Sequence, residues 1–378
     1  DAGAASVNLG ALTVSGSSID LGGGIFNAST LNFNSAGAVT ISEDSNMDLV
    51  GVNTAGTATL SSTGALSDAG ATSVAITGLG NFSGTSISLG GGTFNSGSVT
   101  FNSAGAVTIL EDSAMDLVGI NTGATTLLTS TAGISDAGAT SVNVGALTVN
   151  GTSINLGGGI FNASTLNFNS AGAVTISEDS NMNLVGVNTA GTATLSSTNA
   201  LSDTGATSVV VTGLGNFSGT SINLGGGIFN SGSLTFNSAG AVVISEDSNM
   251  DLVGVNTAGT ATLSSTNALS DAGATSVAIT GLGNFSGTSI SLGGGTFNSG
   301  SVTFNSAGSV TILEDSAMNL VGINTGATTL LTSTAGISDA GATSVNVGAL
   351  TVNGTSINLG GGIFNASTLN FNSAGAVT

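Results

Sequence analysis

The chain repeats itself every 67 or 68 residues, and this period constrains the fold more than any other feature. A period this short is typical of solenoids and other arrays built from one repeated supersecondary unit. Each copy opens on an aspartate, at Asp1, Asp68, Asp136, Asp203, Asp271 and Asp339. The sequence therefore predicts one continuous repeat array over residues 1–378, with copies at 1–67, 68–135, 136–202, 203–270 and 271–338 and a partial copy at 339–378.

Within each copy, apolar and polar residues alternate in short runs such as Leu31-Asn32-Phe33 and Val39-Thr40-Ile41. This alternation indicates half-buried strands, and Gly- and Asn-rich segments such as 22–24 and 34–37 supply the turns between them. The absence of Pro suits strands that must pair on both sides. We predict an all-β parallel β-solenoid (β-helix) with three coils per repeat, each of about 22–23 residues. A β-propeller is the main alternative, but the period is too long for one blade.

The copies come in two forms. Those that begin at residues 1, 136 and 339 carry a segment like Ser141–Val149, and those that begin at 68, 203 and 271 carry a version one residue longer, like Val74–Phe82. The copies at Asp68 and Asp271 are nearly identical and lie 203 residues apart. Such near-identity indicates recent duplication, and it argues against a unique site in any single copy.

The charge balance excludes several classes of partner. The chain has 20 acidic residues and no Lys, Arg or His, which gives a net charge of −20. Nucleic acid is excluded because affinity for it comes from Lys and Arg that neutralise phosphates. Anionic membrane surfaces are disfavoured for the same reason, and no apolar run is long enough to insert into a membrane.

Cysteine is absent as well, so stability depends on neither disulfides nor thiolate metal sites. No signal peptide is visible, and the sequence opens without Met and stops inside a repeat at Thr378. We therefore expect an excerpt of a longer polypeptide, and either continuation in that chain or end-to-end self-association as the main form of partnership.

The most regular polar feature is a Glu-Asp-Ser turn, followed four residues after the Asp by Asp or Asn. Carboxylates and amides are hard oxygen ligands suited to Ca²⁺, although a solvated acidic turn that keeps the protein soluble explains the same pattern. No other cofactor is expected. The weak Ca²⁺ candidates are Glu43, Asp44, Asp48, Glu111, Asp112, Asp116, Glu178, Asp179, Glu246, Asp247, Asp251, Glu314 and Asp315.

Other motifs favour structural roles. The Gly triplets lack the Lys and the helix of a phosphate-binding loop, so we interpret them as tight corners. The recurring Phe residues, such as Phe26 and Phe33, and the recurring Met residues, such as Met47, are expected in the core. Because the chain lacks His and Cys and has no unique cleft, we predict no enzyme activity and no catalytic residue.

Two segments carry a resemblance to a known family. Residues 30–41 (TLNFNSAGAVTI) and 57–68 (TATLSSTGALSD) resemble the repeats of filamentous-haemagglutinin-like bacterial surface proteins, which are giant adhesins built of β-strand repeats. The resemblance covers the whole chain, and it implies a right-handed parallel β-helix, export across the outer membrane and a role at the cell surface. It provides no functional residue, because the secretion domain and receptor-binding tip of such proteins have no counterpart here.

These observations together predict a structural segment of an extracellular bacterial fibre or adhesin stalk that performs no chemistry. The alternative is a multivalent binding surface on a β-solenoid adhesin, in which weak sites for a glycan, Ca²⁺ or a partner cell gain avidity by repetition.

Overall fold

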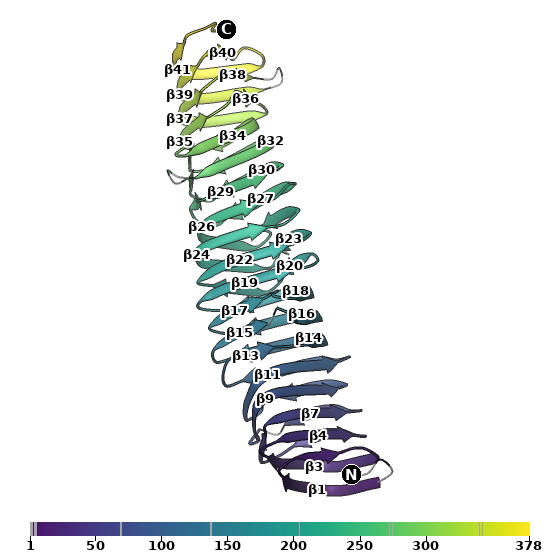
Figure 1. The fold of residues 1–378 in the computed structure, drawn as a ribbon. Coiled ribbons are helices and arrows are strands. Elements are labelled where there is room, and N and C mark those ends of the chain that lie inside the picture. Colours follow the sequence, from purple (N-terminus) through teal and green to yellow (C-terminus); the bar gives the residue numbers. More distant parts are fainter. Residues whose placement is uncertain are drawn as a thin grey trace. The chain divides into compact units, whose positions relative to one another are not determined.

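The computed structural model describes residues 3, 6–68, 70–136, 138–203, 205–271, 273, 275–339, 341 and 343–378. Asp1, which opens the first predicted copy, lies outside the described residues. The chain divides into two compact units, residues 1–182 and 183–378. Both units are all-β, and the described residues contain no helix. In each unit the strands are stacked on one another as the coils of a parallel β-solenoid (Figure 1), which confirms the predicted fold class.

The strands of the first unit are β1 (Ser6–Gly16), β2 (Ile19–Leu21), β3 (Ile25–Ser35), β4 (Ala38–Glu43), β5 (Met47–Leu49), β6 (Val52–Ala55), β7 (Thr57–Ser62), β8 (Ala65–Asp68), β9 (Ser73–Gly84), β10 (Ser86–Leu89), β11 (Thr93–Ser103), β12 (Ala106–Glu111), β13 (Met115–Leu117), β14 (Ile120–Ser130), β15 (Gly133–Asp136), β16 (Ser141–Asn150), β17 (Ser153–Leu156), β18 (Ile160–Asn169) and β19 (Ala173–Glu178). Strand β20 (Met182–Leu184) includes the last residue of this unit.

The strands of the second unit are β21 (Val187–Ala190), β22 (Thr192–Ser197), β23 (Ala200–Asp203), β24 (Ser208–Ser218), β25 (Ser221–Leu224), β26 (Ile228–Asn237), β27 (Ala241–Glu246), β28 (Met250–Leu252), β29 (Val255–Ala258), β30 (Thr260–Ser265), β31 (Ala268–Asp271), β32 (Ser276–Gly287), β33 (Ser289–Leu292), β34 (Thr296–Ser306), β35 (Ser309–Glu314), β36 (Met318–Leu320), β37 (Ile323–Ser333), β38 (Gly336–Asp339), β39 (Ser344–Gly354), β40 (Ser356–Asn358) and β41 (Ile363–Ser373).

The period-two alternation of the sequence places one set of side chains inside each coil. In β4, for example, Val39, Ile41 and Glu43 are buried while the residues between them are exposed. Each strand pairs in parallel with the equivalent part of the next coil, as β1 does with β3 from Ser6 opposite Ile25 onward. Apolar side chains therefore stack on apolar side chains along the core, as alternation requires.

The predicted coil length is wrong. Successive coils lie about 19 residues apart rather than 22–23. In the first unit, seven successive strand pairings connect Leu12 to Leu147, which is the equivalent residue two repeats later. The paired positions are, in order, Leu12, Leu31, β5, Leu66, Ile87, Val107, Thr126 and Leu147. In the second unit seven steps lead from Gly215 through Leu234, β28, Leu269, Ile290, Val310 and Thr329 to Leu350. One repeat therefore makes three and a half coils, not three.

The half coil has a direct structural consequence. Leu12 belongs to one column of stacked core residues, whereas its counterpart one repeat later, Gly80, belongs to another column, above Ala58, Val39 and Ile19. Every element of the repeat thus changes column from one copy to the next, and it returns only after two copies.

The core consists of the predicted Phe and Met residues together with Val, Ile and Leu. Phe26, Phe33 and Met47 are fully buried, as are Met115, Met182, Met250 and Met318, which confirms their predicted places. The two forms of the repeat fill the core differently. Short copies have Leu147 and Val149 where long copies have Gly80 and Phe82, and a Cβ on Gly80 would lie 2.5 Å from the Phe82 ring. Each form therefore keeps its own pairing of a large and a small residue.

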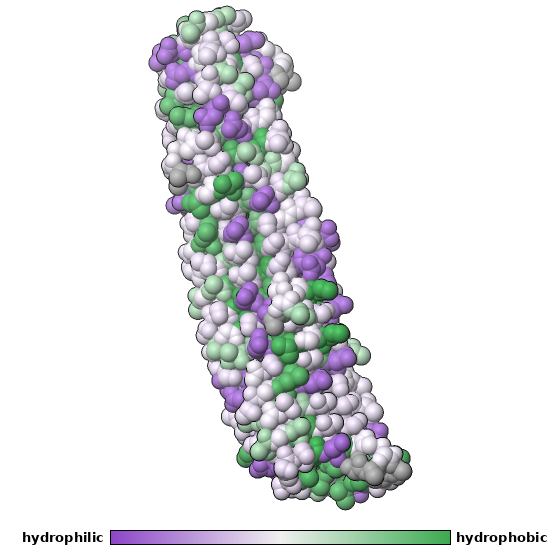
Figure 2. Space-filling view, viewed as in Figure 1, coloured by the Kyte–Doolittle hydropathy of each residue, from purple (hydrophilic) through white to green (hydrophobic). Residues whose placement is uncertain are grey.

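The surface is weakly polar. On the face shown in Figure 2, small side chains of intermediate hydropathy predominate, and hydrophobic and hydrophilic side chains are interspersed among them. Exposed apolar residues such as Ile25, Val52 and Ile120 begin strands. The part of the chain that the structure describes has no helix long and apolar enough to cross a membrane.

A closely packed pair in β14, half-buried Gly123 and buried Thr126, provides a test of this packing. Gly123 and Thr126 stand where the copies that begin at residues 1, 136 and 203 have Ala55 and Ala58, or the equivalent alanines. The copy that begins at residue 271 has the same pair, as Gly326 and Thr329. A Cβ on Gly123 would lie 2.5 Å from the Thr126 Oγ1 and 3.0 Å from a methyl of Val107. The Thr126 Oγ1 is itself buried with no hydrogen-bond partner among the described residues.

We expect Gly123→Ala to lower the free energy of unfolding by about 1–3 kcal/mol through overpacking. Thr126→Ala should raise it by about 1 kcal/mol, because it removes an unpaired hydroxyl. The double variant reproduces the alanine pair of three other copies and should be at least as stable as the wild type. Urea denaturation of the four proteins measures the coupling, and additive effects would contradict this account of the packing.

Candidate functional site

The Glu-Asp-Ser turn replaces a strand in one coil of each repeat. In the second copy, β12 ends at Glu111 and β13 begins at Met115, so that the turn lies over the start of β11. The Asp112 N–H donates to the Phe94 carbonyl oxygen at 2.9 Å, and the Phe94 N–H donates to the Asp112 Oδ2 at 2.9 Å. The Ser96 N–H donates to the Glu111 Oε1 at 2.8 Å. Two carboxylates therefore accept hydrogen bonds from main-chain groups that a neighbouring strand would otherwise satisfy.

The same arrangement recurs in every copy of the turn. The Glu Oε1 accepts from the N–H of Ala28 at 2.7 Å, Ala163 at 2.9 Å, Ser231 at 2.7 Å and Ser299 at 2.8 Å. The Asp Oδ2 accepts from the N–H of Phe26, Phe161, Phe229 and Phe297. The turn is therefore a repeated structural joint.

The expectation that the whole turn is solvated is wrong for its glutamate. Asp44, Asp112, Asp179, Asp247 and Asp315 are exposed, but Glu43, Glu111, Glu178, Glu246 and Glu314 are only 1–2 % exposed. Burial raises the pKa of the Glu111 carboxyl to about 7. The hydrogen bonds from Ser96 and Ser113 lower this pKa, and the neighbouring Asp112 charge raises it. Desolvation is the largest cause because it disfavours the charged form.

The aspartates at the fourth position of the candidate Ca²⁺ set hydrogen-bond to serines of the next coil. Asp116 accepts a hydrogen bond from the Ser135 hydroxyl of the next coil at 3.1 Å, and Asp251 accepts one from Ser270 at 3.2 Å. Asp48 is similarly paired with Ser67. Across the described ranges, no group of three or more acidic residues is placed to hold a metal ion. The turn thus supplies one buried and one exposed carboxylate that both bind main-chain N–H groups.

Sequence reasoning missed a buried asparagine that does similar work. Asn121 is fully buried; its Oδ1 accepts from the Phe101 N–H at 3.1 Å and its Nδ2 donates to the Val118 carbonyl at 3.0 Å. The equivalent residues Asn53, Asn188, Asn256 and Asn324 are fully buried too. The signal that could have identified them is an Asn-Thr pair shared by all five copies, next to strands that vary.

The opening aspartate of the copies after the first also has a local structural role. Asp68 accepts hydrogen bonds from the N–H groups of Gly90 and Gly91, both at 2.9 Å, and Asp136, Asp203 and Asp271 bind the matching glycines of their own copies. Gly90 has a φ of 104°, and a Cβ there would lie 2.5 Å from Leu110. The Gly triplet is therefore a tight corner, as predicted, and its amides are occupied by an aspartate of the same protein.

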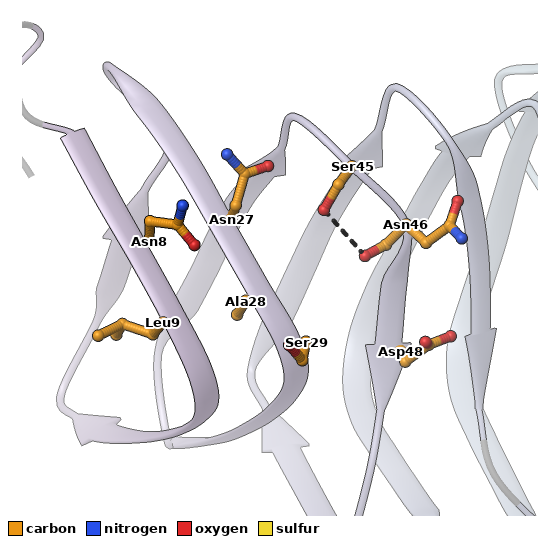
Figure 3. Close-up of a pocket in the computed structure, with 8 residues that line it drawn as sticks. All are labelled: Asn8, Leu9, Asn27, Ala28, Ser29, Ser45, Asn46 and Asp48. Carbon is orange, nitrogen blue, oxygen red and sulfur yellow. Dashed lines mark hydrogen bonds between the residues drawn. The ribbon is translucent and has the colours of Figure 1, made fainter.

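The surface carries shallow polar grooves. One of about 350 Å³ lies near the start of the chain (Figure 3), where Asn8 stacks on Asn27 in the register of β1 and β3. It offers amide, hydroxyl and carboxylate groups and is open to solvent. Its lining residues are Asn8, Leu9, Asn27, Ala28, Ser29, Ser45, Asn46 and Asp48.

Two further grooves of about 380 and 400 Å³ lie at Asn34 and Asn237. Each groove lies in a copy that is followed by a copy of the longer form. Thr77 and Thr280, which lie in the lengthened segments of those following copies, form part of the groove walls. The inserted residue therefore shapes the surface of long copies.

Comparison with protein-family models, with curated proteins and with solved structures finds no match for this chain.

Proposed function

We propose that this chain is a structural segment of an extracellular bacterial fibre or adhesin stalk and that it performs no chemistry. The resemblance of its repeats to filamentous-haemagglutinin-like surface proteins, including their right-handed winding, belongs to this proposal. Localisation at the cell surface and continuation or end-to-end association of the array belong to it as well.

The observation that carries the proposal is the hydrogen-bonded stacking of successive coils within each unit. Strands such as β11 pair with coils on both sides, and where a coil turns, Glu, Asp and Asn side chains take the place of the missing strand. Hydrogen bonds that run along the stacking direction in every coil make a stiff and extended element.

Cryo-electron microscopy of the purified chain tests this function. We expect elongated particles with an axial spacing of about 4.8 Å, unchanged when a Ca²⁺ chelator is added. Particles that collapse or fall apart on chelation would contradict a purely structural role.

A multivalent binding surface is the second candidate, and the polar groove at Asn8 and Asn27 supports it. Stacked amides can hydrogen-bond to sugar hydroxyls, and repetition would convert weak contacts into avidity. A glycan array probed with the wild type and with Asn27→Ala tests the idea. If the wild type binds a glycan and Asn27→Ala does not, the result supports a binding surface. If no glycan binds the wild type, the result contradicts a glycan-binding surface.

A further inference from the structure

Every glutamate of the chain occupies one kind of buried position. The sequence contains five, Glu43, Glu111, Glu178, Glu246 and Glu314, and all other acidic residues are Asp. All five are 1–2 % exposed. A residue type confined to a single environment points to a property that the shorter aspartate does not supply there.

The two oxygens of each carboxyl have different surroundings. The Glu111 Oε1 accepts hydrogen bonds from the Ser96 N–H at 2.8 Å and from the Ser113 Oγ at 2.9 Å. The Oε2 is buried with no hydrogen-bond partner among the described residues, and the same holds in the other four copies. A neutral carboxyl fits such a site better than an ion, because burying an unpaired charge is costly.

No positive group is present to compensate an ionised glutamate. The chain has no Lys, Arg or His, and the strands packed against the turn of the second copy, β11 and β14, contain no charged residue. The charges that do face Glu111 and Glu43 are negative, from Asp112 in one copy and from Asp44 and Asp48 in the other. These neighbours favour the protonated form.

We propose that the five glutamates are proton-binding sites that make each unit of the solenoid more stable in mildly acidic medium than in alkaline medium. The turn is then a pH-responsive joint, since its carboxyl takes the place of a strand over β3, β11 or their equivalents. Loss of the proton should loosen the turn first, where the main-chain pairing depends on side chains. This property goes beyond a purely mechanical role and does not depend on it.

The direction of the effect follows from the shift. Burial raises the pKa of Glu111, Glu178, Glu246 and Glu314 from 4.5 to about 7, and raises that of Glu43 as well. Between these values the folded chain binds more protons than the unfolded chain. Stability is therefore fully present below pH 4.5, falls as the pH rises through about 7, and becomes level about one pH unit higher.

Thermal denaturation of the purified chain between pH 5 and pH 9 tests the proposal. The wild-type melting temperature should fall as the pH rises to about 8. The folding equilibrium should weaken by up to about 100-fold for each of Glu111, Glu178, Glu246 and Glu314, and Glu43 should act in the same direction. The variant with all five glutamates changed to Gln, which keeps the Oε1 acceptor, should lose most of this dependence and be more stable than the wild type at pH 8. Asp116→Asn is the matched control, because Asn183 and Asn319 already occupy that position in other copies, and it should keep the wild-type slope.

Infrared spectroscopy of the wild type with ¹³C-labelled glutamate gives a second readout if the fivefold variant fails to fold. The band of the protonated carboxyl should disappear with a midpoint near pH 7. A midpoint near 4.5, or equal pH slopes for the wild type and the Gln variant, would overturn the proposal. So would a Ca²⁺-induced rise in the melting temperature at pH 8 that the Gln variant lacks, because the turn would then be a cation site.

Discussion

Removal of the twenty residues Ser86–Gly105 should leave the first unit folded, whereas removal of the 23 residues Ser86–Thr108 should unfold it locally. The shorter deletion removes one coil as the structure has it. The longer deletion removes a coil of the length expected if each repeat were divided into three equal coils. After the shorter deletion, Ala106 and Val107 take the places of Ser86 and Ile87 above β8.

The shorter deletion also preserves the hydrogen-bond donors that the acidic turn needs. Phe94 and Ser96 pair with Val74 and Ile76 of the coil below, so that Glu111 and Asp112 would lie over these two residues and accept their N–H groups. The shortened chain loses the hydrogen bonds from Gly90 and Gly91 to Asp68. We therefore expect a modest fall in melting temperature, equivalent to about 1–3 kcal/mol.

The longer deletion shifts the chain by three more residues, and an odd shift exchanges the inner and outer faces of a strand. Ile109 and Glu111, which are buried in the intact chain, would take the outward-facing places of Ser86 and Ser88. Loss of one such buried apolar side chain costs about 2–5 kcal/mol. Circular dichroism with thermal denaturation compares the two proteins. Equal stability, or a more stable 23-residue deletion, would contradict a coil of about 19 residues.

The sequence was sufficient to predict the fold class and most of the core. Alternation in segments such as Val39-Thr40-Ile41, the regular turns and the absence of Pro are local signals, and they specify parallel stacked strands. Phe26, Phe33 and Met47 were placed correctly because large apolar side chains in alternating runs have one face to bury.

Coil length could not be predicted, because the repeat does not contain a whole number of coils. Leu12 and Gly80 hold the same place in successive copies yet stack in different columns. The sequence period therefore reports duplication, whereas coil length depends on which residues hydrogen-bond across neighbouring coils, and the period does not contain that information.

The same missing register explains why the acidic turn was misjudged. Glutamates in a chain of net charge −20 suggest solvent exposure, although Glu111 continues the inward-facing positions of Val107 and Ile109. Its environment is set by the Ser96 N–H, fifteen residues earlier and one coil away. The Ca²⁺ hypothesis stays a prediction, and the register adds that Asp116 accepts a hydrogen bond from Ser135 of the next coil.

Asn121→Ala should lower the free energy of unfolding of the first unit by about 2–5 kcal/mol. The side chain is fully buried, and its amide satisfies the Phe101 N–H and the Val118 carbonyl. Truncation leaves both main-chain groups buried without a partner, and each costs about 1–3 kcal/mol. A water molecule admitted to the vacated space would reduce the loss toward the lower value.

Asn102→Ala is the matched control, because Asn102 is exposed and accepts only the Thr122 hydroxyl in an exposed contact. Its loss should cost less than about 0.5 kcal/mol. Urea denaturation of both variants, with hydrogen exchange at the Phe101 amide, measures the difference, and exchange there should accelerate only in Asn121→Ala. Similar stabilities for the two variants would mean that the coil is closed by apolar packing alone. The expected contrast would instead show that the solenoid depends on side chains that continue the main-chain ladder where a strand is missing.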